Sequence, residues 1–495
     1  MTTELKNRVE RIMSYCQTQA DIYNNYQLGT KVVINGIYGA FGFSGFYFYN
    51  KNIAEAVTKQ GKHAILNAES IINKWAQKVW LRDKKTHKMM GVAIKPSCKS
   101  ITNSVSIYCD TDSIYSSYEE IINSTDWFDH KVWRLTKVNK QNDQKDFIYV
   151  SKGGYPTLDD AKEYFKVSDI DLEKYSYEID EIEPDGREFC LTINRVFMAD
   201  FLKKVHEDYA EKQGTPNILD FELEGYLDAG IWLAKKKYIK NLTWAEPNIY
   251  YDSCTKIKPT GVEIAQTSSS PWVKKQLTDM VKWIFKQKEF SIKGMTAELK
   301  RVKEQFMLQS PEIICVNKGM NKYSEYVMND TDEIELQPKA MVTIQGASFY
   351  NHLLNTNDKY KKKYGILSDS DKLCVLYIKP TPKYTYWKKE NIVNIKDYIK
   401  CPDMYKLVTD KKATIRPDGM GKPYEAFTDA MSKVQVEAFS FPAGLYPKEL
   451  IISKGIEIDY ERMFDLLILG PMNRIIEAMN QPPICLDMAF EEGLW

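Results

Sequence analysis

The chain has 495 residues, which suggests about three domains or subdomains of ordinary size. Its 68 lysines and arginines nearly balance 67 aspartates and glutamates, so any nucleic-acid-binding function must come from local patches and not from overall charge. A hydrophobic content of 43% with 13% aromatic residues allows sizeable cores and argues against a disordered chain. No apolar run is long enough to predict a membrane helix, so we expect no membrane partner.

The amino-terminal segment MTTELKNRVERIM is polar and compatible with a helix, and it lacks the apolar core of a secretory signal. The nine cysteines are scattered, with none closer together than Cys98 and Cys109. This spacing excludes CxxC zinc sites and a disulfide framework. We therefore expect a protein of the reducing cytoplasm.

The first third of the chain predicts helices followed by a hairpin. Residues 2–28 are polar and helical, and they run into an apolar stretch that contains three glycines. Residues 51–80 carry apolar side chains at helical spacing, which predicts a second long helix. Residues 105–117 (VSIYCDTDSIYSS) alternate on both sides of a short turn and predict a β-hairpin.

The remainder predicts a mixture of elements, and the fold class is therefore α+β. Residues 124–186 look like a small α+β insertion, with strands at 132–138 and 146–150 and a short helix at 158–167. A helix is expected over 189–213, and strands over 218–227 and 230–244 are expected to pair as a hairpin. The later predictions are helices near 272–288, 295–308 and 458–480, and strands near 340–346 and 372–379.

The strongest chemical signal is the motif Tyr108–Ser113, which carries Asp110 and Asp112 two residues apart on the predicted turn. Paired carboxylates on a tight hairpin create an oxygen-lined, negative site that suits Mg²⁺. Two such ions can activate an attacking hydroxyl and stabilise a leaving pyrophosphate. The structural alternative is that Asp and Ser simply favour the turn, which explains most isolated Asp-x-Asp motifs.

A second motif lies upstream, where Lys31, Asn35 and Tyr38 occur at i, i+4 and i+7 and share one helical face. This face offers a positive charge for a phosphate, an amide for hydrogen bonding and a ring for stacking. Taken alone, this pattern is more typical of an ordinary solvated helix face.

The third motif is the run Lys235, Lys236, Lys237 and Tyr238. In a strand, Lys236 and Tyr238 share one face while Lys235 and Lys237 share the other. Lysines suit phosphates and the tyrosine suits a base or sugar edge. The alternative is an edge strand that uses lysines to prevent aggregation.

Together, these motifs resemble those of the family B DNA polymerases. Lys31–Gly39 is similar to the fingers motif Lys-x-x-x-Asn-Ser-x-Tyr-Gly, Tyr108–Ser113 to the palm motif Tyr-Gly-Asp-Thr-Asp-Ser, and Lys235–Tyr238 to the primer-gripping Lys-Lys-Arg-Tyr element. They occur in family order, and the T-even-type bacteriophage branch fits best. Gly36, Cys109 and Lys237 depart from the family pattern, and none of these changes removes a metal ligand.

The resemblance implies a polymerase right-hand architecture, in which an antiparallel palm sheet accompanies helical fingers and a mixed thumb. Glu222 lies in a segment similar to the acidic strand before the lysine motif, which makes it a further metal-proximal carboxylate. The implied segments are partial fingers (1–50), first palm part (51–123), insertion (124–186), second palm part (187–275), thumb (276–480) and carboxy-terminal tail (481–495).

The same resemblance implies a DNA-directed DNA polymerase that joins deoxynucleoside triphosphates to primer–template DNA. Asp112 and Asp110 are the expected catalytic and metal residues, with two Mg²⁺ ions as cofactors and Mn²⁺ as a substitute. The nucleotide-binding residues are expected to be Lys31, Asn35, Tyr38 and Gly39, and the primer–template-binding residues Lys235, Lys236, Lys237 and Tyr238.

The family's other metal-binding aspartate belongs to an upstream motif, Asp-x-x-Ser-Leu-Tyr-Pro, which is absent before Lys31. The amino-terminal and exonuclease parts are missing too. We therefore expect a polymerase in split form, in which a second polypeptide supplies these parts. The alternatives are a non-catalytic DNA-binding or assembly subunit that retains polymerase motifs, and an Asp-x-Asp-dependent transferase or phosphatase with a doubly wound sheet.

The carboxy-terminal tail is rich in apolar and aromatic residues. Similar tails of related polymerases bind sliding clamps, so the tail is a candidate clamp-binding peptide. The alternative is that these side chains pack back onto the thumb. The residues concerned are Leu486, Met488, Phe490 and Trp495.

Overall fold

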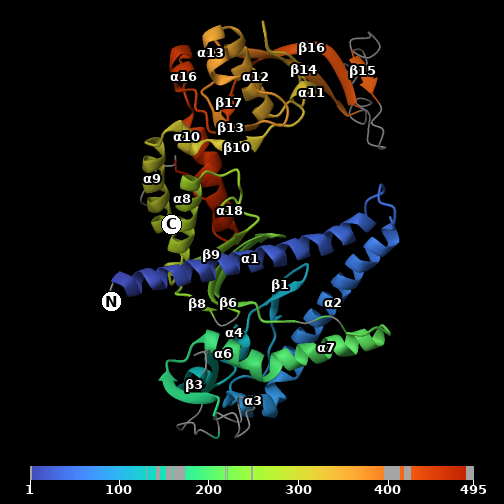
Figure 1. Cartoon of the computed structure of the whole chain (residues 1–495), viewed down its shortest axis with the longest axis vertical. Helices are drawn as coiled ribbons and strands as arrows, with labels where there is room; N and C mark the ends of the chain where they lie inside the picture. The colour runs from blue at the N-terminus through green and yellow to red at the C-terminus, as the bar shows by residue number, and fades with distance from the viewer. Residues whose placement is uncertain are drawn as a thin grey trace. The chain divides into compact units, whose positions relative to one another are not determined.

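The computed structural model divides into two compact units (Figure 1). It describes residues 3–129, 131–140, 145–151, 159, 173–217, 219, 221–246, 249–394, 413–416 and 425–486. Unit 1 comprises Met1–Tyr226 with Ala245–Asn248, and unit 2 comprises Leu227–Trp244 with Ile249–Trp495. The fold is of the predicted α+β class, because helices accompany sheets whose strands pair mainly antiparallel.

Unit 1 is built around the long helix α2, which follows the more exposed helix α1 in the chain. The amphipathic helix α2 buries Ile72, Trp75 and Ala76 against the other helices of this unit. Asn50 caps α2, since its side chain accepts hydrogen bonds from the backbone N–H groups of Asn52 and Ile53. The elements are α1 (Thr3–Phe41), α2 (Lys51–Lys78), η1 (Trp80–Arg82), α3 (Lys84–Met90), β1 (Ser106–Asp110), β2 (Ser113–Ser116), α4 (Glu119–Asn123), η2 (Trp127–Asp129), α6 (Gly186–Ile193), η4 (Asn194–Met198) and α7 (Ala199–Lys212).

The predicted insertion forms a three-stranded antiparallel sheet in the order β4-β3-β5. Its strands are β3 (Val132–Asn139), β4 (Lys145–Ser151) and β5 (Tyr175–Ile182). The first two were expected from the sequence and the third was not. The short helix expected at 158–167 lies, apart from one residue, outside the described residues.

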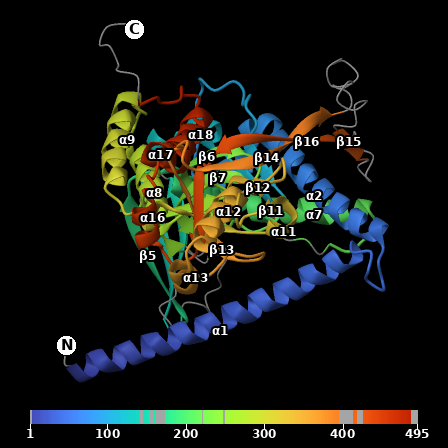
Figure 2. The ribbon, with the colours of Figure 1, turned by 90° about the horizontal axis from the view of Figure 1, so that it is seen from above.

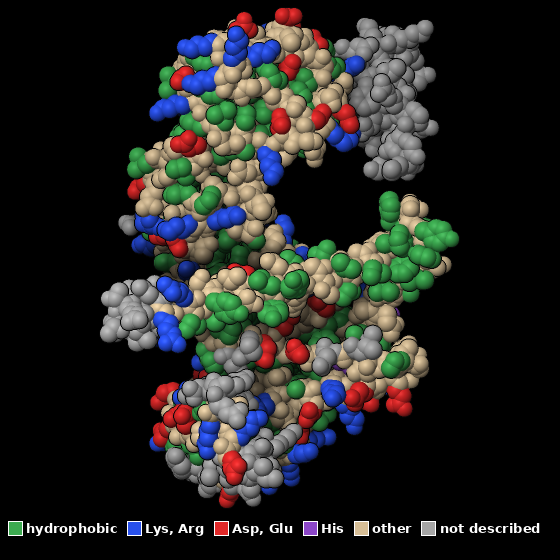
Figure 3. Space-filling view, viewed as in Figure 1, with side chains coloured by type: hydrophobic (Ala, Val, Ile, Leu, Met, Phe, Trp, Pro, Cys, Tyr) green, Lys and Arg blue, Asp and Glu red, His purple; other side chains and the backbone are tan. Residues whose placement is uncertain are grey.

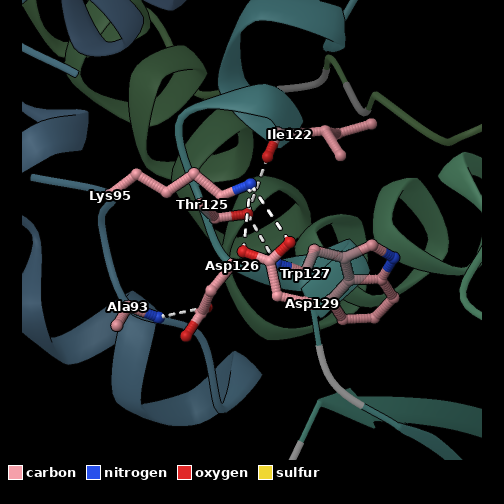
Figure 4. Close-up of polar contacts among 7 residues, drawn as sticks. All are labelled: Ala93, Lys95, Ile122, Thr125, Asp126, Trp127 and Asp129. Atoms are coloured by element: carbon pink, nitrogen blue, oxygen red, sulfur yellow. Dashed lines mark hydrogen bonds and ion pairs between the residues drawn. The ribbon is translucent and has the colours of Figure 1, made fainter. Parts of the chain in front are cut away.

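The chain entering this sheet is fastened to the preceding segment by polar contacts (Figure 4). The Asp126 carboxylate accepts a hydrogen bond of 2.7 Å from the backbone N–H of Ala93, and Lys95 forms an ion pair of 3.1 Å with Asp129. Trp127 is fully buried, and its indole N–H donates to the backbone oxygen of Asp185, at the other end of the insertion. The two ends of the insertion are therefore joined within unit 1.

Unit 2 contains three sheets. The first places β7 between β6 and β8 and also pairs β7 with β9; the second has the order β10-β13-β17, and the third β11-β12-β14-β16-β15. The strands are β6 (Gly225–Ala234), β7 (Lys237–Ala245), β8 (Ile249–Tyr250), β9 (Lys256–Thr260), β10 (Val316–Gly319), β11 (Val327–Asn329), β12 (Glu335–Leu336), β13 (Lys372–Tyr377), β14 (Thr385–Asn394), β15 (Ala413–Arg416), β16 (Glu425–Gln435) and β17 (Ala438–Pro442).

The helices of unit 2 bury their apolar faces in one continuous core with these strands. Phe306 illustrates this packing, since it is fully buried and meets Phe464 edge to face at 5.5 Å. The helices are α8 (Pro271–Lys286), α9 (Ile292–Met307), α10 (Pro311–Ile314), α11 (Tyr323–Tyr326), α12 (Val342–Asn355), α13 (Asp358–Tyr364), α16 (Lys448–Lys454), α17 (Tyr460–Phe464), η5 (Asp465–Leu469) and α18 (Gly470–Ala478).

Most of the long predicted elements are confirmed, and the strand expected near 340–346 is wrong. That segment begins α12, because Ile344, Ala347 and Leu354 recur at helical spacing and are buried. Gly346 allows the helix to lie close to β17, since a Cβ atom there would come within 2.5 Å of Ser440 Oγ. No helix in the described ranges is long and apolar enough to cross a membrane.

Glu188 provides a pH-dependent test of the unit 1 core. Its side chain is 4% exposed, and one carboxylate oxygen pairs with Arg187 at 3.0 Å while the other has no hydrogen-bond partner. Burial raises the pKa of Glu188 above its ordinary value of 4.5, against the opposing effect of Arg187. Between the ordinary pKa of the unfolded chain and the higher pKa of the folded chain, the folded chain binds more protons. The free energy of unfolding therefore falls as the pH rises through this range.

We expect Glu188→Gln to stabilise the protein at neutral pH and to have little effect below pH 4.5. Chemical denaturation of both proteins across about pH 4–8 measures this difference. Glu207→Gln, at an exposed position of α7, is the matched control. A stabilisation that is the same at every pH would contradict the assignment to the Glu188 carboxyl.

Candidate active site

The Asp110–Asp112 motif lies on a two-stranded antiparallel hairpin, as predicted. Strand β1 ends at Asp110, β2 begins at Ser113, and the two residues between them form the turn. Thr111 has a left-handed backbone with φ of 56°, which closes this tight connection. This antiparallel hairpin does not match the early strand of a doubly wound sheet that the transferase or phosphatase alternative requires.

A bulge sets the orientation of the hairpin. The pairing register of β1 with β2 shifts between Ser106 and Tyr108, and the Ser106 hydroxyl lies 3.6 Å from the Cys109 thiol. Ser106 also contacts α2, where its hydroxyl donates to Glu69 and its backbone N–H donates to Asn73. Since side chains alternate along a strand, Asp110 lies on the face opposite Cys109, away from α2.

The carboxylate of Asp112 is exposed and takes no part in building the turn. The turn is closed by backbone atoms, with the N–H of Asp112 bonded to the backbone oxygen of Asp110 at 2.6 Å, and by the hydroxyl of Ser113. In the described part of the chain the Asp112 carboxylate accepts no hydrogen bond and forms no ion pair. An aspartate needed for turn formation normally bonds to the nearby backbone, and the Asp112 carboxylate makes no such bond within the described ranges.

These two carboxylates provide only part of a metal site. No group of three or more His, Cys, Asp or Glu side chains within the described ranges is arranged to hold a metal ion. Glu222, the third expected ligand, is exposed in the segment that precedes β6. The acidic strand expected at 218–227 is absent over Phe221–Glu224. The donor set of Asp110 and Asp112 suits Mg²⁺, but it needs additional oxygen ligands.

The Lys31 motif lies near the carboxy-terminal end of α1, and the helix continues through it to Phe41. Lys31, Asn35, Tyr38 and Gly39 are all exposed, and a Cβ atom at Gly39 would meet no neighbour within 4 Å. The predicted stripe is therefore present on one face of the helix and accessible to a ligand.

The lysine motif forms the turn of the β6–β7 hairpin, so the predicted strand alternation is wrong for Lys235 and Lys236. The expected hairpin between 218–227 and 230–244 is wrong as well, because the chain reverses inside the second segment. A turn at the lysines leaves Ile231 and Ile239 on separate strands, and both reach the core of unit 2. Lys235, Lys236 and Lys237 are exposed, whereas Tyr238 is 7% exposed.

Gly261 holds the base of this lysine turn. Its φ is 64°, and a Cβ atom there would lie 2.0 Å from the backbone oxygen of Lys236. Lys236 itself has a φ of 61°. The geometry of the lysine turn therefore depends on a glycine at residue 261.

Two lysines that flank this hairpin form a like-charged cross-strand pair that the sequence analysis missed. Lys240 of β7 lies directly opposite Lys258 of β9. Its ammonium also lies 5.4 Å from the centre of the Tyr238 ring. Two lysines at one register position add to the positive charge of this hairpin, which suits phosphates. The alternation of lysines in the segment Lys256–Thr260 was the available signal.

The tail residues are only partly described. Leu486 is half-buried against the core of unit 2. The other expected clamp contacts, Met488, Phe490 and Trp495, lie outside the described residues. The division of the chain into fingers, palm and thumb likewise stays a prediction.

Comparison with known proteins agrees with the motifs. Residues 3–128 match the model of DNA polymerase family B, a range that includes both the Lys31 motif and the Asp110–Asp112 hairpin. The chain is thus similar to family B DNA polymerases of the T4 type, the family that its motifs resemble.

Two bacteriophage proteins are similar to most of the chain. The DNA-directed DNA polymerase of Enterobacteria phage T4 is 22% identical over 329 residues, covering 65% of this chain and 29% of that protein. The DNA-directed DNA polymerase of Escherichia phage RB69 is 24% identical over 265 residues, covering 53% of this chain and 22% of that protein. The matched region therefore spans less than a third of either relative.

Proposed function

We propose that this chain contributes part of the active site of a DNA-directed DNA polymerase. The primer 3′-hydroxyl attacks the α-phosphate of a deoxynucleoside triphosphate, and pyrophosphate leaves. The observation that carries the proposal is the exposed Asp112 carboxylate, which the turn does not need, on a hairpin within the family B match. Viral DNA replication in the host-cell cytoplasm is the corresponding process.

Each motif has a distinct role in this proposal. Asp112 and Asp110 hold Mg²⁺, which when bound favours ionisation of the primer hydroxyl and neutralises the leaving group. Lys31 neutralises the triphosphate and Asn35 orients it, while Tyr38 and Gly39 pack against the nascent base pair. Lys235, Lys236, Lys237 and Tyr238 hold the primer–template, with Glu222 near the metal.

The exposed apolar side chains of helix α1 support the proposal that the assembled enzyme contains a second polypeptide. Val32, Val33 and Ile34 are consecutive, and each is about 60% exposed (62%, 62% and 61%). Because successive helical residues are about 100° apart, these side chains cover more than half of the circumference. Figure 2 shows α1 as a long single helix, and Figure 3 shows hydrophobic side chains along it. An exposed helix that is apolar on several sides requires covering partners.

The incomplete carboxylate set supports the same arrangement. Asp110 and Asp112 need further oxygen ligands, and the described residues do not group a third acid with them. We propose that the second polypeptide supplies the missing palm aspartate, the exonuclease and the other fingers helix. The non-catalytic subunit remains as the alternative.

The test is co-expression with the polypeptide encoded by the neighbouring gene, followed by primer extension with each chain alone and together. We expect synthesis only from the pair, and Val32→Glu with Val33→Glu should weaken co-purification. Thr18→Glu, at an exposed polar position of the same helix, is the control. Robust synthesis by this chain alone would contradict the split arrangement.

Lys258→Ala tests the DNA-binding role of the like-charged pair. Removing one phosphate contact should weaken primer–template binding several-fold and reduce the slope of log affinity against log salt by about 1. Stability should change by less than about 0.5 kcal/mol, because Lys258 is exposed. Fluorescence anisotropy at several salt concentrations measures the primer–template affinity and its salt dependence, with exposed Lys300→Ala as the control.

Removal of residues 487–495 tests the proposed clamp-binding tail while retaining Leu486 in its packed position. We expect the truncated chain to lose stimulation by the clamp and to keep basal primer extension. Clamp-dependent synthesis assays compare the two chains, and unchanged stimulation would reject the clamp-binding role.

A further inference from the structure

Unit 1 contains a pocket of about 590 Å³ that is lined by none of the polymerase-like motifs. It lies where the end of α2 and the following turn η1 meet η4 and the start of α7. Its wall combines aromatic rings with positive charges, which belong to Lys74, Trp75, Lys78, Arg82, Phe197 and Phe201.

The aromatic side of the pocket is a cluster of three rings, in which Trp75 and Phe201 are also only 6.3 Å apart. Trp75 and Phe197 are stacked with centroids 4.9 Å apart, and Phe197 and Phe201 are stacked at 5.0 Å. Phe197 lies in the π-helical turn η4, an irregularity that is frequent at functional sites. The indole N–H of Trp75 is buried and has no hydrogen-bond partner. The pocket thus offers stacked ring surface to a planar ligand.

The charged side of the pocket consists of three exposed cations at four-residue spacing, Lys74, Lys78 and Arg82. Within the described ranges, none of them forms an ion pair. Like charges four residues apart destabilise a helix by a few tenths of a kcal/mol per pair. The lining also includes the acid Asp83, whose carboxylate already accepts hydrogen bonds from the backbone N–H and hydroxyl of Thr86.

We propose that this pocket binds nucleotide units, with the base against the phenylalanine rings and the phosphates on Lys74, Lys78 and Arg82. Stacking accepts any base, and the unpaired cations suit a phosphate backbone. Lys74 and Lys78 lie one turn apart on α2, a rise of about 6 Å, and Arg82 lies beyond the end of α2 in η1, so the three cations are spread over more than one phosphate group. The site therefore binds a short single strand in preference to a free nucleotide. This inference is independent of the proposed polymerase activity.

Photo-crosslinking of the full chain identifies the site directly. The probe is an oligothymidylate of about eight nucleotides that contains one 5-iododeoxyuridine, and the products are mapped by mass spectrometry. We expect crosslinks in the peptides containing Trp75, Phe197 or Phe201. Competition by unlabelled oligothymidylate supports a single-strand site, whereas competition by ATP alone assigns the same pocket to a free nucleotide.

Matched variants distinguish this pocket from other nucleic-acid contacts. Lys74→Ala with Lys78→Ala should reduce pocket crosslinking at least about tenfold, since two phosphate contacts are lost. Phe201→Leu should reduce it while preserving most of the packing. Lys88→Ala with Lys99→Ala removes two exposed lysines that do not line the pocket and serves as control.

The result that overturns the proposal is an absence of crosslinks in these peptides, or crosslinks that the Lys74 and Lys78 substitutions leave unchanged. Both lysines are exposed, so thermal unfolding of this variant should match the parent chain and show that folding is intact. Asp112→Asn should leave pocket crosslinking unchanged. The pocket and the polymerase activity are thereby tested separately.

Discussion

Replacing Asp112 with asparagine is expected to reduce primer extension by the assembled enzyme at least about 10³-fold. Such a loss corresponds to about 4 kcal/mol of transition-state stabilisation, a magnitude typical for the loss of one charged group at a reacting centre. Asparagine keeps the size of the side chain and removes its negative charge. The measurement is single-turnover incorporation of one nucleotide at saturating primer–template.

The stability of this variant is the informative control. The Asp112 carboxylate is exposed and accepts no hydrogen bond from the described residues, so Asp112→Asn should change the free energy of unfolding by less than about 0.5 kcal/mol. Asp208→Asn, at an exposed position of α7, should affect neither synthesis nor stability. Unaltered extension by Asp112→Asn would instead favour the non-catalytic subunit.

Gly261→Ala is expected to destabilise unit 2 by about 2–4 kcal/mol and to disturb the lysine turn. Two costs combine at this residue. A φ of 64° is unfavourable for alanine by about 1–2 kcal/mol, and the new Cβ would lie 2.0 Å from the backbone oxygen of Lys236. Because that oxygen belongs to the backbone, relief requires the lysine turn itself to move. Primer–template affinity should therefore fall together with stability.

Gly455→Ala separates these two costs. Gly455 has nearly the same φ, 65°, but a Cβ atom there would meet no neighbour within 4 Å. This substitution should show only the conformational penalty of about 1 kcal/mol, with unchanged DNA binding. Urea denaturation measures the free energy of unfolding of both variants. Equal destabilisation would show that the contact with Lys236 contributes nothing to the effect of Gly261→Ala.

The sequence predicted the elements whose signals are local. The amphipathic pattern of α2 and the alternation around Thr111 both specify their structures within a short window, and both are confirmed. The segment 340–346 shows the limit of this reasoning. Its β-branched residues favour a strand locally, whereas close contact between Gly346 and Ser440 places it in a helix against β17.

The candidate site divides in the same way. Residue types at short spacing marked the Asp110–Asp112 hairpin, the Lys31 stripe and the lysine run as candidates, and their resemblance to family B polymerase motifs favoured a functional interpretation. Only the tertiary structure showed that Lys235 and Lys236 form a turn, that Lys258 lies opposite Lys240, and that Trp75 stacks on Phe197. These pairings join residues from separate elements, and their contacts depend on how strands register and helices pack, which short-range patterns do not encode.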